Sequence, residues 1–234
     1  TTGSNNVLSG YNAGGAITEG VRNITIGSDS LSTVTTQDDN VAIGHNALLN
    51  AESSENVAVG SGAGAATTTQ GANVYIGYQA GTANTTGLNI AIGQLALASN
   101  NTGTSNIVIG TKAMDANVAG DESIAIGDQA LTNMNPSGNV DMFNLAVGHN
   151  AGKACTVGTK NTILGNYALF TDDTGSGSVA VGYKALYAQD PSSTTDMDNV
   201  AVGEESAVNL TEGNRNTIIG QGAASTLTTG DSNV

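Results

Sequence analysis

The sequence predicts an all-β chain that folds as a parallel β-solenoid (β-roll) of about 13 coils with a 17-residue period. A glycine-marked motif recurs along all 234 residues, and apolar residues alternate within each copy, which is the period of a β-strand. Large side chains are scarce, since aromatic residues make up only 3% of the chain and Trp is absent. A conventional globular core is therefore not available, and small side chains must fill a narrow interior.

Each copy of the motif reads Asn, apolar, small, apolar, Gly, two variable residues, Ala, and then Leu or Gly, as in Asn40 to Leu48. Successive marker glycines lie 16, 17 or 21 residues apart. That period is shorter than the repeats of helical solenoids, whereas it suits strands stacked in parallel, one per coil. The marker glycines are Gly10, Gly27, Gly44, Gly60, Gly77, Gly93, Gly110, Gly127, Gly148, Gly165, Gly182, Gly203 and Gly220.

The parts of a copy predict the parts of a coil. We expect the leading Asn to stack on itself as a hydrogen-bonded ladder, with a simple turn preference as the alternative. The marker Gly ends the strand at a sharp corner, because glycine tolerates a positive φ. The constant Ala suggests a second short strand that faces a narrow interior. A polar stretch, such as residues 82–87, then closes the coil.

Both faces of each strand are apolar in sequence. We expect the first and third strand residues, such as Val41 and Ile43, to fill the coil. The middle residue, such as Ala42, would then point away from them, although an open solvated face is expected to carry Thr, Lys or Glu. The middle residues are therefore predicted to meet another chain, so the pattern predicts an oligomer without setting its number of subunits.

Charge and motif content exclude several functions. The net charge of −14 argues against binding to nucleic acid or anionic membrane, and no apolar stretch of about 20 residues predicts membrane insertion. Cys155 has no partner in the chain, so it could form a disulfide only with another chain, and it is expected to be a free thiol that is buried or semi-buried. We find no catalytic set, phosphate loop or clustered metal ligands, so the sequence predicts no enzyme activity, no cofactor and no metal site.

The repeat resembles the arrays in the tail fibres of tailed bacteriophages. The loops Asn84-Thr85-Thr86-Gly87-Leu88-Asn89 and Asn101-Thr102-Gly103-Thr104-Ser105-Asn106 carry this likeness, with the 17-residue spacing. The repeat is also similar to that of the β-roll head of trimeric autotransporter adhesins, which is a few residues shorter. The resemblance implies a homotrimer about a fibre axis, in which residues 1–234 form a single array within a longer fibre.

The same resemblance implies a location and partners. The chain would lie in a virion tail, contact other virion tail proteins, and position or form a surface that binds a host glycan or protein. The alternative is the head of a bacterial trimeric adhesin at a cell surface. A polysaccharide-cleaving tailspike is the third possibility. No catalytic residue of either family can be transferred to this array.

Nine residues are candidate receptor contacts. Two copies carry insertions with the only prolines of the chain, and Pro136 and Pro191 align at a distance of three coils, so both loops should bulge from one edge. Loops on a rigid scaffold often carry binding, although the insertions could instead pack on neighbouring coils or chains. The variable residues after the marker glycines predict an exposed edge, or else an unselected solvent face. The candidates are Pro136, Asp141, Met142, Phe143, Pro191, Asp196, Met197, Tyr78 and Tyr183.

Overall fold

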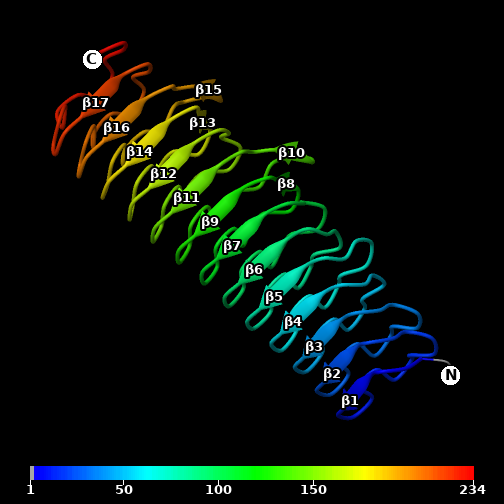
Figure 1. Ribbon diagram of the computed structural model, residues 1–234. Helices are drawn as coiled ribbons and strands as arrows, with labels where there is room; N and C mark the ends of the chain where they lie inside the picture. Colours follow the sequence, from blue (N-terminus) through cyan, green and yellow to red (C-terminus); the bar gives the residue numbers. More distant parts are fainter. Residues whose placement is uncertain (1–2) are drawn as a thin grey trace. The chain divides into compact units, whose positions relative to one another are not determined.

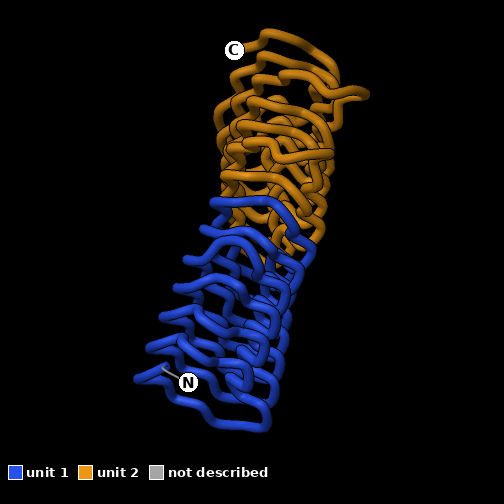
Figure 2. Tube along the Cα trace, turned by 90° about the vertical axis from the view of Figure 1, so that its right-hand side faces the viewer, with its two compact units in different colours: residues 1–112 blue, residues 113–234 orange. Residues whose placement is uncertain are grey.

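The computed structural model describes residues 3–234, which are all-β and contain no helix. The chain divides into two compact units, residues 1–112 and residues 113–234 (Figure 2). In each unit the backbone winds through successive coils, and every coil contributes one three-residue strand to a parallel sheet.

Unit 1 contains seven such strands, stacked in sequence order (Figure 1). Each strand pairs in parallel with the next, and equivalent residues of successive copies face each other, as Val41 does with Val57. The strands are β1 (Val7–Ser9), β2 (Ile24–Ile26), β3 (Val41–Ile43), β4 (Val57–Val59), β5 (Val74–Ile76), β6 (Ile90–Ile92) and β7 (Ile107–Ile109).

Unit 2 repeats this arrangement with six strands and adds two short pairs at the insertions. The stacked strands are β9 (Ile124–Ile126), β11 (Leu145–Val147), β12 (Thr162–Leu164), β14 (Val179–Val181), β16 (Val200–Val202) and β17 (Thr217–Ile219). With seven strands in one unit and six in the other, the predicted parallel β-solenoid of about 13 coils is confirmed.

The inserted residues form small parallel sheets of their own. β10 (Val140–Asp141) pairs with β8 (Gly120–Asp121), and β15 (Thr195–Asp196) pairs with β13 (Gly175–Ser176). Figure 1 shows these pairs along the edge of unit 2 that lies away from its stacked strands. Each insertion therefore pairs with the preceding coil, and both lie on one edge, as the three-coil alignment predicted.

The marker glycines turn a corner that other residues cannot. Gly44 has a φ of 134°, in a region that only glycine visits readily. A Cβ added to Gly44 would also lie 2.6 Å from the backbone of Gly60 in the next coil. The repeated Gly is therefore required for two reasons, which are the positive φ at the corner and the close approach of successive coils.

The Ala three residues after the marker Gly faces the interior as predicted, since Ala47 is fully buried. The prediction that this Ala belongs to a second short strand was wrong, because the described strand of this coil is Val41–Ile43 alone. Its neighbours Asn46 and Leu48 have φ values of 58° and 48°. A left-handed residue on each side of Ala47 breaks the extended backbone that a strand needs. Coils still bond here, because Leu48 N–H donates to the carbonyl of Ala63 at 3.0 Å.

The assignment of the two strand faces was also wrong. The middle residue of each strand points into the coil: Ala42, Ala58 and Ala91 are fully buried. The first and third residues point outward and are half-buried or exposed. The physical reason is space, because a coil with Ala on the opposite wall leaves little room for two β-branched side chains at every turn.

The leading Asn residues form the predicted ladder. The Oδ1 atom of Asn40 accepts the backbone N–H of Asn56 at 3.0 Å, and Asn40 N–H in turn donates to Asn23 Oδ1 at 3.0 Å. The side chains are fully buried, so each rung satisfies groups that water cannot reach. Ser178 interrupts the ladder, and there Gln189 accepts the side-chain N–H of Asn199 at 2.8 Å instead.

Candidate functional site

A solvent-accessible aliphatic surface, in part half-buried and in part exposed, runs along the stacked strands of each unit. We call it the outer stripe, and it comprises the first and third residues of those strands. In unit 1, 13 of its 14 positions are Val or Ile, the exception being Ser9. In unit 2, 10 of its 12 positions are Val, Ile or Leu, the exceptions being Thr162 and Thr217. Isolated exposed aliphatic residues are ordinary, whereas a continuous row of them is a feature that binding surfaces share.

The outer stripe is accessible to solvent although its residues are apolar, with most of them half-buried and the rest exposed. Ile107 and Ile109 are each 36% exposed, and Ile26 is 41% exposed. On an antiparallel or solenoid sheet with one face in water, these positions would carry polar side chains. The stripe can therefore bury a repeating apolar face against another molecule. The sequence analysis identified these apolar residues but placed them inside the coil.

Four of the nine candidate receptor contacts are buried. Met142 and Met197 are fully buried in the interior of unit 2, and Pro136 and Pro191 are buried as well. The inserted loops turn back so that their methionines fill space beside the longer coils. These four residues therefore offer no surface to a receptor. Their burial fits the alternative interpretation, in which each insertion packs on neighbouring coils.

The other five candidates lie at the surface. Asp141 and Asp196 are exposed in the paired strands of the two insertions, and Phe143 is 48% exposed beside the first of them. Tyr78 is 51% exposed in unit 1, and Tyr183 is 42% exposed in unit 2. Their contact with a receptor stays a prediction.

Tyr183 belongs to a group of rings that the sequence did not single out. We call it the aromatic cluster: Tyr167, Phe170, Tyr183 and Tyr187, with His149 at one end. Phe170 and Tyr187 stack with centroids 5.2 Å apart and planes at 4°. Tyr167 lies between His149, at 5.3 Å, and Tyr183, at 6.2 Å. Four of the eight Phe and Tyr residues of the chain are thus gathered in one place.

Two lysines lie over these rings. The Nζ atom of Lys153 is 5.9 Å from the centroid of Phe170, and that of Lys184 is 5.5 Å from Tyr187. A signal for the cluster existed, since Lys153, Phe170 and Tyr187 each stand five residues after a marker Gly in three successive coils. Equivalent residues of stacked coils are neighbours, so this column could have been found by aligning the copies.

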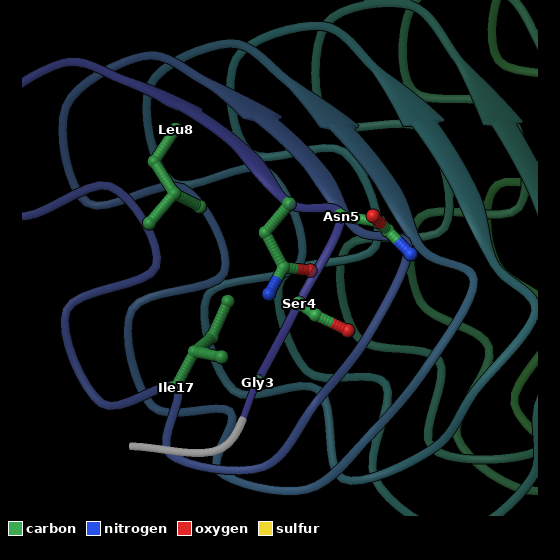
Figure 3. A pocket seen from close by; sticks show the side chains of 6 residues that line it. Gly3, Ser4, Asn5, Leu8 and Ile17 are labelled. Atoms are coloured by element: carbon green, nitrogen blue, oxygen red, sulfur yellow. The ribbon is translucent and has the colours of Figure 1, made fainter.

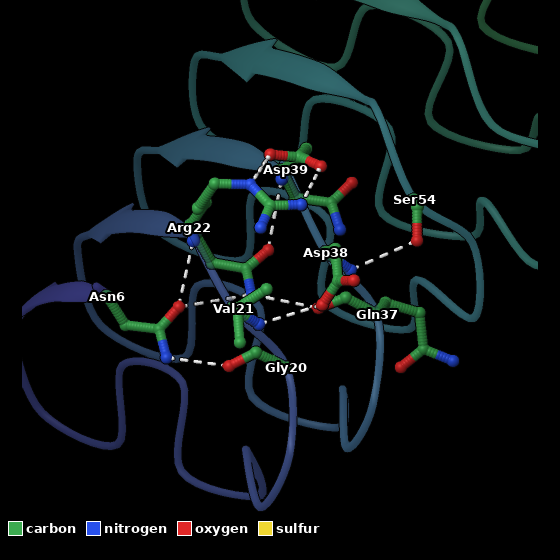
Figure 4. A network of polar contacts seen from close by, with 10 residues as sticks. Asn6, Gly20, Val21, Arg22, Gln37, Asp38, Asp39 and Ser54 are labelled. Carbon is green, nitrogen blue, oxygen red and sulfur yellow. Dashed lines mark hydrogen bonds and ion pairs between the residues drawn. The ribbon is translucent and has the colours of Figure 1, made fainter. Parts of the chain in front are cut away.

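The acidic pairs of the loops have separate structural roles. Arg22 binds Asp39 of the next coil through two contacts, at 2.6 and 2.7 Å (Figure 4). The adjacent carboxylate of Asp38 instead accepts the backbone N–H of Val21 at 2.8 Å. The hydrogen bonds from Arg22 lower the pKa of Asp39 below its ordinary value. These groups join one coil to the next and do not converge on a shared point.

Two titratable groups lie in the interior of unit 2. Cys155 is buried and free, as predicted, and burial raises the pKa of its thiol to about 12. Burial also raises the pKa of Asp172 to about 6, although hydrogen bonds from Gln189 and from the backbone of Gly175 oppose that shift. Both side chains point into the coil, where no substrate has access.

Three pockets are shallow features of the described residues. One, of about 260 Å³, lies in the first described coil, where Leu8 and Ile17 point toward its interior (Figure 3). A second, of about 270 Å³, is lined by Ile218, Ala223 and other residues of the last coil. Both are coil interiors that no further described coil covers. The third, of about 250 Å³, lies beside Phe170 in the aromatic cluster.

Within residues 3–234, no three His, Cys, Asp or Glu side chains are grouped so as to hold a metal ion. The same residues include no helix of the length and apolarity that crossing a membrane requires. Comparisons with known protein families, with curated proteins and with solved structures found no match to this chain.

Proposed function

We propose that this chain is a structural and adhesive segment of a bacteriophage tail fibre, in which three copies associate about a common axis. The outer stripe supports this proposal most directly. It places two aliphatic side chains outward at nearly every coil, so an interface built on it would continue along each unit. The interface of a permanent assembly is expected to be apolar in this way.

The repeat itself supports a fibre. Each coil contacts only its neighbours, so such an array extends without a change of cross-section and serves to span distance. The number of subunits and the location in a virion tail are proposed from the resemblance of the repeat to tail fibre arrays. A host glycan or protein would be contacted by the side chains that vary from coil to coil.

The oligomeric state tests the proposal. Native mass spectrometry should give a mass of about 70 kDa, three times the 23.2 kDa of one chain. Replacing Ile107 and Ile109 together by Lys places two charges in the outer stripe and should release monomers. The control Thr111→Lys adds a charge at an exposed position of the same coil and should leave the trimer intact.

Location separates a tail fibre from a bacterial adhesin. Gold-labelled antibody against the chain should mark the tails of purified phage particles that contain it. Labelling of bacterial surfaces instead would favour the adhesin head. A wild-type chain that is monomeric at micromolar concentration would contradict both.

A further inference from the structure

We propose that the pocket beside Phe170 in the aromatic cluster binds one neutral pyranose ring of a glycan. This inference rests on the proposed adhesive function and names the class of receptor. The pocket is lined by Asn133, Lys153, Ala154, Phe170 and Thr171, so an aromatic face and several polar groups surround one small space.

The Phe170 ring is held as a rigid platform. Tyr187 stacks on it at 5.2 Å, and Tyr167 lies against it at 5.6 Å. Thr171 is fixed as well, because its hydroxyl donates to the carbonyl of Tyr187 at 2.9 Å. A platform that is ordered before binding avoids the entropy that a mobile ring would lose.

The chemistry of the pocket suits a sugar. The C–H groups on one face of a pyranose carry slight positive charge, and the face of an aromatic ring is negative. The ammonium of Lys153 offers three N–H donors, and the amide of Asn133 offers both donors and an acceptor, which match ring hydroxyls. Among the described residues, the ammonium groups of Lys153 and Lys184 lie over rings and pair with no carboxylate.

The volume of the pocket and the net charge of the chain limit the class of ligand that can bind. Pockets for drug-sized molecules occupy about 300–1,000 Å³, so a pocket of about 250 Å³ takes a single ring while the rest of a chain runs outside it. A net charge of −14 repels acidic polysaccharides at a distance. The fitting ligand is therefore a neutral hexose unit, from either a capsule or a lipid-linked glycan.

The test uses the fact that the chain contains only two Phe residues, Phe143 and Phe170. Full-length protein labelled with 4-fluorophenylalanine should give two ¹⁹F signals, which the variant Phe143→Leu assigns. The probes are neutral hexasaccharides of glucose, galactose and mannose, with a hyaluronan hexasaccharide as the acidic counterpart. At least one neutral probe should shift the Phe170 signal and leave Phe143 unchanged.

Variants then locate the site. Phe170→Leu keeps an apolar side chain but removes the aromatic face, and should weaken binding by up to roughly tenfold. Lys153→Gln keeps a donor and should weaken it less, whereas Tyr78→Ala, an exposed tyrosine of unit 1, should change nothing. Each variant is checked for unchanged circular dichroism.

Three results would overturn the inference: no shift with any neutral probe up to millimolar concentration, a shift of Phe143 alone, or binding of hyaluronan only. The trimer mass and the virion labelling involve no sugar. A negative titration with those two results positive therefore rejects the glycan site and leaves the proposed function standing.

Discussion

The ring of Tyr75 occupies the space that a side chain at Gly64 would need. A Cβ built on Gly64 would lie 2.5 Å from Cδ2 of Tyr75, and Gly81 on the other side of the ring is blocked in the same way. Gly64 and Gly81 stand where other coils carry a buried Leu, such as Leu48 and Leu97. The alternation of Leu and Gly in the repeat is therefore a matter of volume, since a large inner strand residue requires glycine beside it.

This relationship predicts an energetic coupling between Tyr75 and Gly81. Tyr75→Ala should cost about 3–5 kcal/mol of unfolding free energy because it leaves a cavity, and Gly81→Leu should destabilise through overpacking. The double variant should be more stable than the sum of the two losses predicts, by about 1 kcal/mol or more. Leu is compatible with the backbone there, since Leu97 has a φ of 53° and Gly81 one of 57°.

Urea unfolding of the four proteins measures this coupling. Tyr75→Phe is the matched control, because it removes only the hydroxyl that accepts a hydrogen bond from Asn84 and keeps the ring volume. Strictly additive losses would show that Tyr75 and Gly81 do not compete for the same space.

The Asn ladder predicts a cost for each rung. Asn40→Ala removes the acceptor of the Asn56 backbone N–H and leaves that buried group without a partner. A buried unsatisfied donor costs about 1–3 kcal/mol, so unfolding should shift to lower urea concentration. Asn50→Ala, at an exposed position of the same coil, is the control and should change stability little. Equal stability of the two variants would mean that the rungs carry no net energy.

Features that repeat by position could be predicted from the sequence. The coil length, the parallel register and the ladder follow from the spacing of Gly and Asn alone, because equivalent residues of successive copies must stack. The orientation of the strand did not follow, because both faces are apolar and hydrophobicity does not distinguish them. Side-chain size is the better guide, because the inner position is Ala in seven of the 13 stacked strands, as at Ala91, whereas its neighbours Ile90 and Ile92 are large.

The candidate site was harder to predict, because its contacts involve residues that occur in one or two coils and do not recur along the array. The sequence analysis placed Met142 and Met197 at the surface as receptor contacts. A loop that is four residues longer nevertheless has enough chain to return them to the interior. The aromatic cluster comes from a column that changes from coil to coil, with Lys153 beside Phe170 in only one place. Such contacts leave no signal in a single copy, and aligning the copies reveals only the column that holds Lys153, Phe170 and Tyr187.

The buried thiol of Cys155 predicts chemical protection. A thiol with a pKa of about 12 is almost entirely protonated at pH 8, and burial also excludes reagents. Native protein should therefore react with Ellman's reagent far more slowly than protein unfolded in guanidinium chloride, which serves as the control. Comparable rates in the two states would show that Cys155 is exposed in solution.

The carboxyl group of Asp172 predicts an unusual dependence of stability on pH. Its pKa is about 6 in the folded chain because of burial, against the ordinary value of 3.8. Between these two pH values the folded chain holds a proton that the unfolded chain has lost, so the unfolding free energy falls as the pH rises from about 4 to 6. Two pKa units correspond to a loss on the order of 3 kcal/mol at neutral pH.

Substitution isolates this contribution from that of the other 19 acidic residues. Asp172→Asn removes the titrating group, so the difference in unfolding free energy between variant and wild type should change by up to about 3 kcal/mol between pH 4 and 7. The change should favour the variant at the higher pH, because only the wild type must bury a charge there. Asp141→Asn, at an exposed position of β10, should show no such trend. If the difference for Asp172→Asn is constant across this range, the carboxyl group titrates alike in the folded and unfolded chains, and its burial has no effect on its charge.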